Sequence, residues 1–162
     1  MAQVFNQDGQ PYKNVTLKNL INLFAQISAS NQGLKEHTFG DIWEIDLSET
    51  NYALSHLSIE GANFSQHELT YNFKLYVMDL VSKDESNEND VLSEMLQTIG
   101  DFISVLKNSQ TLGIDTNTDY RMNENINCVP FTERFDNEVS GWVADISITV
   151  SFDASACVGD IN

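Results

Sequence analysis

Residues 70–106 read TYNFKLYVMDLVSKDESNENDVLSEMLQTIGDFISVL, and this stretch decides which fold the chain can adopt. Its first part, TYNFKLYVMDLV, carries large apolar side chains at both odd and even positions. A strand with two apolar faces is typical of the interior of a sheet that is covered on both sides. We therefore expect a central strand that continues through about Val81.

The second part of the stretch predicts a long helix that packs on the sheet. KDESNEND gathers capping residues, so the helix is expected to start near Ser86 or Asn87. Lys107 lies near the negative end of the helix dipole, and three acidic residues lie near its positive end: Glu85, Glu88 and Asp90. The apolar residues recur at helical spacing and form one wide face: Val91, Leu92, Met95, Leu96, Ile99, Phe102, Ile103 and Leu106.

The N-terminal part predicts an extended arm followed by another helix. Residues 1–13 form the expected arm, and Asn14 is the residue that we expect to cap the helix N-terminus. Gly33 is expected to end this helix in a left-handed conformation. Between the two caps, apolar residues recur at helical spacing: Leu17, Leu20, Ile21, Phe24 and Ile27.

Further strands are expected on both sides of the central unit. One covers 52–60 and is followed by a turn at Gly61, and another covers 126–131. In 142–152 the even-numbered residues are apolar and the odd-numbered ones mostly polar, which predicts a half-buried strand with one face toward water or a partner. Without repeats or linkers, residues 1–162 are expected to form a single α+β domain.

The charge balance is strongly acidic. Lys and Arg number 8 against 24 Asp and Glu, which gives a formal net charge of -16, while a hydrophobic fraction of 41% is enough for an ordinary core. Such a domain repels nucleic-acid phosphates and anionic membranes. Two interpretations stay open: the charge keeps the protein in solution, or it forms a surface past which DNA slides without sticking.

The N-terminal sequence and the cysteines indicate the cellular compartment of the protein. The N-terminus has no basic and apolar regions of a secretory signal, and no apolar run approaches the ~20 residues that span a bilayer. Cys128 and Cys157 fit a reducing compartment with buried thiols, although they would pair if their strands were neighbours. We expect synthesis in the cytosol and no membrane partner.

Motifs for metal or cofactor chemistry are missing from the sequence. Asp115, Asn117 and Asp119 resemble the start of an EF-hand loop, but Tyr120 and Ile126 stand where Gly and Glu are needed. The histidines have no partner at metal-ligand spacing and are expected to be solvated or hydrogen-bonded: His37, His56 and His67. No nucleotide-binding or nucleophile motif is present. We expect no metal, no cofactor and no enzymatic activity.

Two further features of the sequence each have two interpretations. Asp79 interrupts an apolar strand, either as a strand-end residue bonded to backbone amides, which we favour, or as a functional acid in a pocket. The segment CVPFTERFDNEVSGWVADISITV predicts a long β-hairpin whose aromatics pack back on the sheet, or else a projecting loop with interface anchors. The candidate subunit contacts are Phe131, Thr132, Glu133, Arg134, Phe135 and Asp136.

These segments together resemble a family. YVMDLV, KDESNENDVLSEMLQTIGDFISVL and PFTERFDNEVSGWVADISITVSF, with LKNLINLF and FGDIWEID, are similar to head–tail connector, tail-completion and tail-terminator proteins of tailed bacteriophages. Ring proteins of crAss-like phages belong to this group. The resemblance covers about residues 15–157, and none of its motifs is catalytic.

The resemblance implies a fold and a function. The fold is an α+β domain with a single mixed or antiparallel sheet, two main helices packed on one side and a long β-hairpin near the C-terminus. The function is that of a structural virion protein, assembled in the host cytoplasm into a six-fold or twelve-fold ring at the portal–tail junction. Its partners would be copies of itself and the adjacent portal, connector or tail proteins, with DNA passing through the lumen without specific binding. The alternatives are a major tail-tube subunit and a small ligand-binding module or enzyme that uses Asp79.

Overall fold

The computed structural model describes residues 16–41, 50–108, 120–134 and 138–152. The expected N-terminal arm, residues 1–13, lies outside these described residues. The described elements are α1 (Leu17–Ser30), β1 (Glu36–Phe39), β2 (Leu54–Phe64), β3 (Glu68–Leu80), α2 (Glu88–Lys107), β4 (Arg121–Met122), β5 (Cys128–Arg134) and β6 (Glu138–Ser151).

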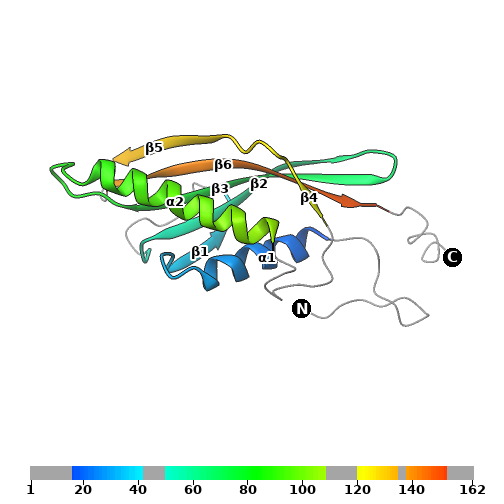
Figure 1. Cartoon of the computed structure of the whole chain (residues 1–162), viewed down its shortest axis with the longest axis horizontal. Coiled ribbons are helices and arrows are strands. Elements are labelled where there is room, and N and C mark those ends of the chain that lie inside the picture. Colours follow the sequence, from blue (N-terminus) through cyan, green and yellow to red (C-terminus); the bar gives the residue numbers. More distant parts are fainter. Residues whose placement is uncertain (1–15, 42–49, 109–119, 135–137, 153–162) are drawn as a thin grey trace.

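The strands form one mixed sheet, in which β1, β2, β3 and β6 lie side by side in that order (Figure 1). β1 and β2 are parallel, and the other pairs are antiparallel. β3 pairs with one edge of β6, so β4 and β5 share the other edge, β4 at 148–149 and β5 at 138–144. The predicted α+β class, with two helices and a hairpin near the C-terminus, is confirmed.

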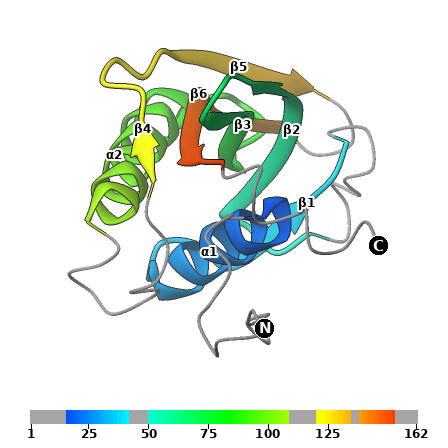
Figure 2. The same cartoon turned by 90° about the vertical axis from the view of Figure 1, so that its right-hand side faces the viewer.

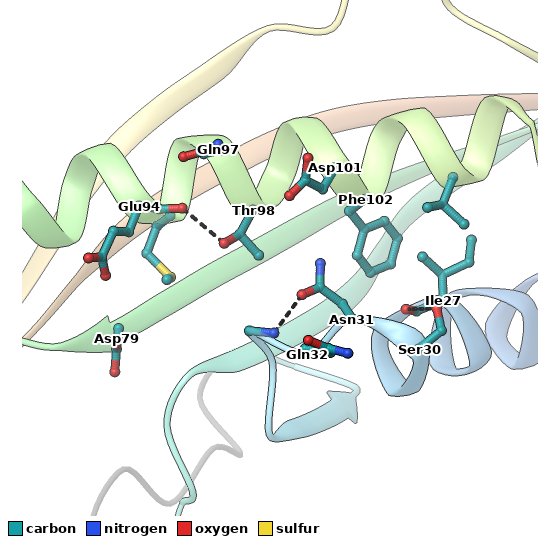
Figure 3. A pocket seen from close by; sticks show the side chains of 13 residues that line it. Ile27, Ser30, Asn31, Gln32, Asp79, Glu94, Gln97, Thr98, Asp101 and Phe102 are labelled. Atoms are coloured by element: carbon teal, nitrogen blue, oxygen red, sulfur yellow. Dashed lines mark hydrogen bonds between the residues drawn. The ribbon is translucent and has the colours of Figure 1, made fainter.

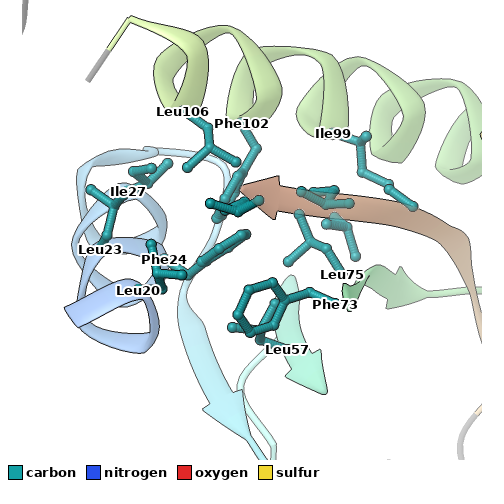
Figure 4. Packing of buried hydrophobic residues seen from close by; sticks show 14 of the residues in the cluster. Leu20, Leu23, Phe24, Ile27, Leu57, Phe73, Leu75, Ile99, Phe102 and Leu106 are labelled. Carbon is teal, nitrogen blue, oxygen red and sulfur yellow. The ribbon is translucent and has the colours of Figure 1, made fainter. Parts of the chain in front are cut away.

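Both helices pack on one face of the sheet and bury the main core (Figure 4). Phe24 of α1 contacts Phe73 of β3 and Phe102 of α2, with ring-centroid distances of 5.3 and 5.6 Å. The three rings lie at the centre of the core. Burying each of them stabilises the fold by roughly 1.5–3 kcal/mol. Figure 2 shows α1 beside β1 and α2 beside β6, and the two helices also contact each other.

The opposite face of β3 is only partly covered, which corrects the prediction of two buried faces. Met78 is buried there with Leu54 and Val139 in a small second cluster. Thr70 and Lys74 are only half-buried, and the Thr70 hydroxyl lies 2.9 Å from that of Thr149. The polar residues at even positions of β3, such as Thr70 and Lys74, already indicated a strand with one buried and one partly exposed face. The residues that face the helices are all buried: Leu69, Tyr71, Phe73, Leu75 and Val77.

The ends of α1 differ from the prediction. Thr16, and not Asn14, is the N-cap, because its hydroxyl accepts a hydrogen bond from the Asn19 amide at 3.2 Å in a capping box. The helix ends at Ser30 with an extended cap residue, Asn31. Gly33 follows in the turn and donates its amide to the Asn31 side chain at 2.8 Å, so a left-handed glycine does not end the helix.

The Thr16 cap provides a first test. Replacing Thr16 with alanine removes the acceptor for the Asn19 amide, and we expect the free energy of unfolding to fall by about 1 kcal/mol. Urea denaturation monitored by circular dichroism measures the change. Thr16→Ser keeps the hydroxyl and should unfold close to the wild-type midpoint. Equal midpoints for the alanine and serine variants would contradict the assignment of Thr16 as the cap.

The strand after 52 is longer than expected, because β2 does not turn at Gly61. Its pairing with β3 shifts register between Ile59 and Gly61, so the glycine lies at a β-bulge, and the strand continues to Phe64. The turn comes at Ser65, whose amide donates to the Glu68 carbonyl at 2.9 Å. The resulting hairpin extends past the ends of both helices (Figure 1).

The second helix and the last strands agree better with the sequence. α2 begins at Glu88 after Asn87, within two residues of the predicted start. β6 begins at Glu138, four residues before the predicted start at 142, so Gly141 lies inside the strand. β5 extends to Arg134, and only residues 135–137 separate it from β6. The expected strand over 126–131 is therefore shifted toward the C-terminus, and it forms the predicted hairpin with β6.

Candidate functional site

Among the described residues, the most exposed large apolar side chain is Phe64, on the β2–β3 hairpin. We use the name projecting hairpin for residues 59–68, where every residue is exposed or half-buried. Phe64 is 63% exposed and Ile59 is 36% exposed. The sequence signal for this surface was a single phenylalanine beside a polar turn, and it was missed because β2 was expected to end earlier.

The pairing register places these apolar residues on one face. Ile59 pairs with Phe73, and Phe64 pairs with Leu69. Phe73 and Leu69 both belong to the core under the helices, so Ile59 and Phe64 continue the helix-bearing face beyond the part that the helices cover. Ile59 and Phe64 therefore form an apolar strip on the projecting hairpin. No described residue covers this strip completely.

The end of β6 supports the projecting hairpin. The Phe152 amide donates to the His67 carbonyl at 2.9 Å, and the Phe152 ring meets the Phe64 ring edge-on with centroids 5.1 Å apart. On β4, Arg121 pairs with Glu68 at 2.5 Å, but both side chains are largely exposed. Such a surface ion pair contributes little to stability. Backbone pairing and the aromatic contact therefore hold the hairpin in place.

The predicted contact residues of the last hairpin lie on strand β5 as far as they are described. Phe131 packs back on the sheet, with its ring 6.1 Å from that of Tyr76. The Thr132 hydroxyl lies 2.9 Å from that of Ser140 and donates to Glu88 at 3.0 Å, which ties β5 to the start of α2. Glu133 and Arg134 pair through their backbones with β6. Phe135 and Asp136 lie outside the described residues, and the role of the set as subunit contacts stays a prediction.

The outer edge of β5 is a poor place for another strand to add. The Asp145 amide donates to the Asn127 carbonyl at 3.0 Å, so residues 127, 129 and 131 turn their backbone groups toward β6. Cys128, Pro130 and Thr132 then turn theirs outward, and Pro130 has no amide hydrogen to offer. Edge pairing through β5 is thus blocked at its middle.

Two of the three histidines form partly buried hydrogen bonds, in line with the expectation that they are solvated or hydrogen-bonded. His56 Nε2 lies 2.8 Å from the Gly40 carbonyl and donates to it, and Nδ1 lies 2.6 Å from the Thr38 hydroxyl. His37 Nδ1 lies 2.6 Å from the Ser55 hydroxyl, which lies 2.8 Å from that of Ser28 on α1. Sequence spacing did not reveal this network, because its members come from α1, β1 and β2.

The histidine network has a structural role rather than a nucleophilic one. Ser55 is fully buried, so its hydroxyl cannot reach a substrate. Burial, with a smaller effect from nearby His56, lowers the pKa of His37 from 6.5 to about 4. The neutral ring therefore prevails near neutral pH. His67, by contrast, is exposed in the turn of the projecting hairpin.

Asp79 lies at a strand end and also at a pocket, and a functional role for its carboxylate stays a prediction. Its Oδ1 accepts from the Leu80 amide at 2.8 Å, as favoured for a strand-end residue. It also lines a pocket of about 570 Å³ between the end of α1 and α2 (Figure 3). Within the described residues, no group of three metal-ligating side chains occurs, and neither helix is long and apolar enough to cross a membrane.

Comparison with models of known protein families finds no match, and comparison with curated proteins finds none either.

Proposed function

We propose that this protein is a structural subunit of a tailed-bacteriophage virion, which assembles into a homo-oligomeric ring at the portal–tail junction and lets DNA pass. The ring would act as a tail terminator, completion or connector layer between portal and tail proteins. The observation that carries the proposal is the projecting hairpin, with its exposed Phe64 and Ile59.

An apolar strip on a projecting strand pair supports contact with another protein. Phe64 is an aromatic side chain with 63% of its surface in water, and aromatics are enriched among the residues that anchor interfaces. We take a second copy of the chain as the partner. A strand pair that extends past the helices of its own subunit can touch the next subunit of a ring, where each hairpin meets a different surface of its neighbour.

The charge of the chain fits DNA passage through such a ring. With a net charge of -16, contact between copies must come from apolar and hydrogen-bonding surfaces, because like charges repel at long range. The same repulsion acts on DNA phosphates and keeps them from binding to the lumen. The resemblance of the sequence to connector and terminator proteins is the reason that we propose a ring at the portal–tail junction rather than another kind of ring.

The projecting hairpin can be tested directly by mutation. Phe64→Asp places a charge in the proposed contact, and we expect the dissociation constant of the ring to rise by about thirtyfold, the effect of losing roughly 2 kcal/mol at an aromatic anchor. Native mass spectrometry over a concentration series measures the oligomers. Arg134→Glu tests the contact predicted from the sequence and should also weaken the ring.

A matched control comes from α2. Leu96 is 43% exposed and lies on the helix rather than the hairpin, so Leu96→Asp should leave the oligomers unchanged. Circular dichroism should show that all variants are folded. Wild-type oligomers that survive Phe64→Asp unchanged, or a wild type that forms none at any concentration, would refute the proposed ring contact.

The tail-tube subunit remains the second candidate, because it forms rings from the same kind of surface and then stacks them. Electron microscopy of the purified protein separates the two. A terminator or connector gives single closed rings, whereas a tube subunit gives stacked polymers of variable length.

A further inference from the structure

β1 is a short strand at the edge of the described sheet. It has four residues, none of them fully buried, and in the described sheet it pairs with β2 alone. Figure 2 shows it beside α1. Parallel pairing is slightly less stable per residue than antiparallel pairing, and elements with few buried contacts open most readily. The side-chain bonds that hold β1 therefore decide whether this edge stays closed.

Two histidines connect β1 with β2, one on each face of the sheet. His37 of β1 lies 2.6 Å from the Ser55 hydroxyl on the helix-bearing face, since Ser55 pairs with Val77 of the main core. His56 of β2 lies 2.6 Å from the Thr38 hydroxyl on the opposite face, because successive side chains of a strand alternate. The two strands thus share an imidazole hydrogen bond on each face.

The His37 ring is enclosed between the sheet and α1. Its partner Ser55 is fully buried, and the Ser55 hydroxyl lies 2.8 Å from that of Ser28 on α1. The other ring nitrogen, Nε2, is buried, and no described residue gives it a hydrogen bond. A neutral ring can place a lone pair there. A protonated ring carries donors on both nitrogens, so a charged N–H group would be buried without an acceptor.

No described charge compensates a proton on His37. The elements packed against β1 carry these titratable or charged side chains: Lys18 on α1, and His56 and Glu60 on β2. Lys18 and Glu60 are exposed to water. Burial lowers the pKa of His37, and the nearby His56 lowers it further. On β1 itself, Glu36 accepts a hydrogen bond from the Asn51 amide at 2.7 Å.

We propose that β1 is an acid-released edge strand. When His37 takes up a proton, β1 separates from β2 and α1 so that the ring reaches water, while β2, β3 and β6 stay paired through their longer registers. The release exposes the edge of β2 at 54–57, where another strand can add. It involves neither the projecting hairpin nor the proposed ring contact.

Hydrogen exchange of the full chain, followed by NMR, tests the release. The reporters are the Lys35 and Gly40 amides, which donate to the Ala53 and Leu57 carbonyls at 2.9 and 3.1 Å. Between pH 7 and pH 5 their protection factors should fall about twentyfold, as expected for a pKa of about 4 in the closed state and 6.5 in the open state. The fall should depend only weakly on urea, because a local opening exposes little surface.

Two histidine variants and a central strand serve as controls. His37→Asn removes the titrating ring and should remove this fall in protection. His67→Asn removes an exposed histidine and should leave the fall unchanged. The amides of Phe73 and Leu75 lie in β3, which is paired on both sides, so they should exchange only on global unfolding, with a strong dependence on urea.

Two results would overturn the proposal. One is an equal pH dependence of the reporter amides in the wild type and in His37→Asn. The other is a fall in wild-type protection with the same urea dependence as Phe73, because the ring would then reach water only on global unfolding. This second measurement needs no variant. The ring assay with Phe64→Asp at neutral pH does not depend on either result, so the two proposals fail separately.

Discussion

Gly141→Ala is expected to lower the free energy of unfolding by about 3 kcal/mol, at the upper end of the range for overpacked sites. A Cβ atom at position 141 would lie 1.9 Å from the Val77 carbonyl oxygen and 2.8 Å from the Met78 Cα. Both are backbone atoms of the paired strand β3, so no side chain can rotate away. The strands must separate locally, and the small cluster around Met78 and Val139 must open with them.

Chemical denaturation in urea measures the loss, and α2 offers a matched control. A Cβ added at Gly100 meets nothing within 4 Å, and this residue is exposed in the helix. Gly100→Ala should therefore raise the free energy of unfolding by about 1 kcal/mol through better helix propensity. An unchanged midpoint for Gly141→Ala would mean that β3 and β6 do not approach as closely as described.

Acidification is expected to destabilise the protein through His37. The folded-state pKa is about 4 and the unfolded value is 6.5, because burial disfavours the charged ring. Above pH 6.5 the ring is neutral in both states and has no effect on stability. As the pH falls from 6.5 toward 4, the unfolded state takes up a proton that the folded state excludes. The loss amounts to about 2 kcal/mol at pH 5.

The effect of His37 must be separated from every other pH-dependent contribution to stability. His37→Asn retains a polar side chain beside Ser55 and removes the titration, so the difference between variant and wild type isolates the histidine. Urea midpoints at pH 7, 6 and 5 measure it. Parallel pH curves for the two proteins would show that His37 is accessible to protons in the folded state.

Elements with strong local periodicity were predictable. The apolar face of α2 and the alternation of β6 appear in the structure nearly as the sequence indicates, since Met95, Ile99 and Phe102 are buried, as are Ala144 and Ile146. Predictions that rested on single residues, such as the turn at Gly61, were less accurate. Gly61 was expected to turn the chain because glycine often does, yet pairing with β3 keeps β2 extended through a bulge. Whether the chain forms a turn or a β-bulge at a glycine depends on the strand that pairs with it. The sequence around the glycine does not reveal that partner.

The candidate sites were the least predictable part. The pocket combines Asp79 from β3 with Asn31 after α1 and Glu94 from α2, residues that only packing brings together. The contact between His37 and Ser55 likewise depends on the parallel pairing of β1 with β2. No spacing rule connects such residues, because the contacts are set by the topology of the sheet.

The stretch 70–106 by itself determined a strand, an acidic helix start and an amphipathic helix, because hydrophobic periodicity and capping act over a few residues. Only the tertiary structure decided that β3 is covered mainly on one face and that its hairpin with β2 extends past the helices. It also decided that Gly141 must remain without a side chain. These features depend on distances between strands remote in sequence, where the available space is a property of the packed molecule.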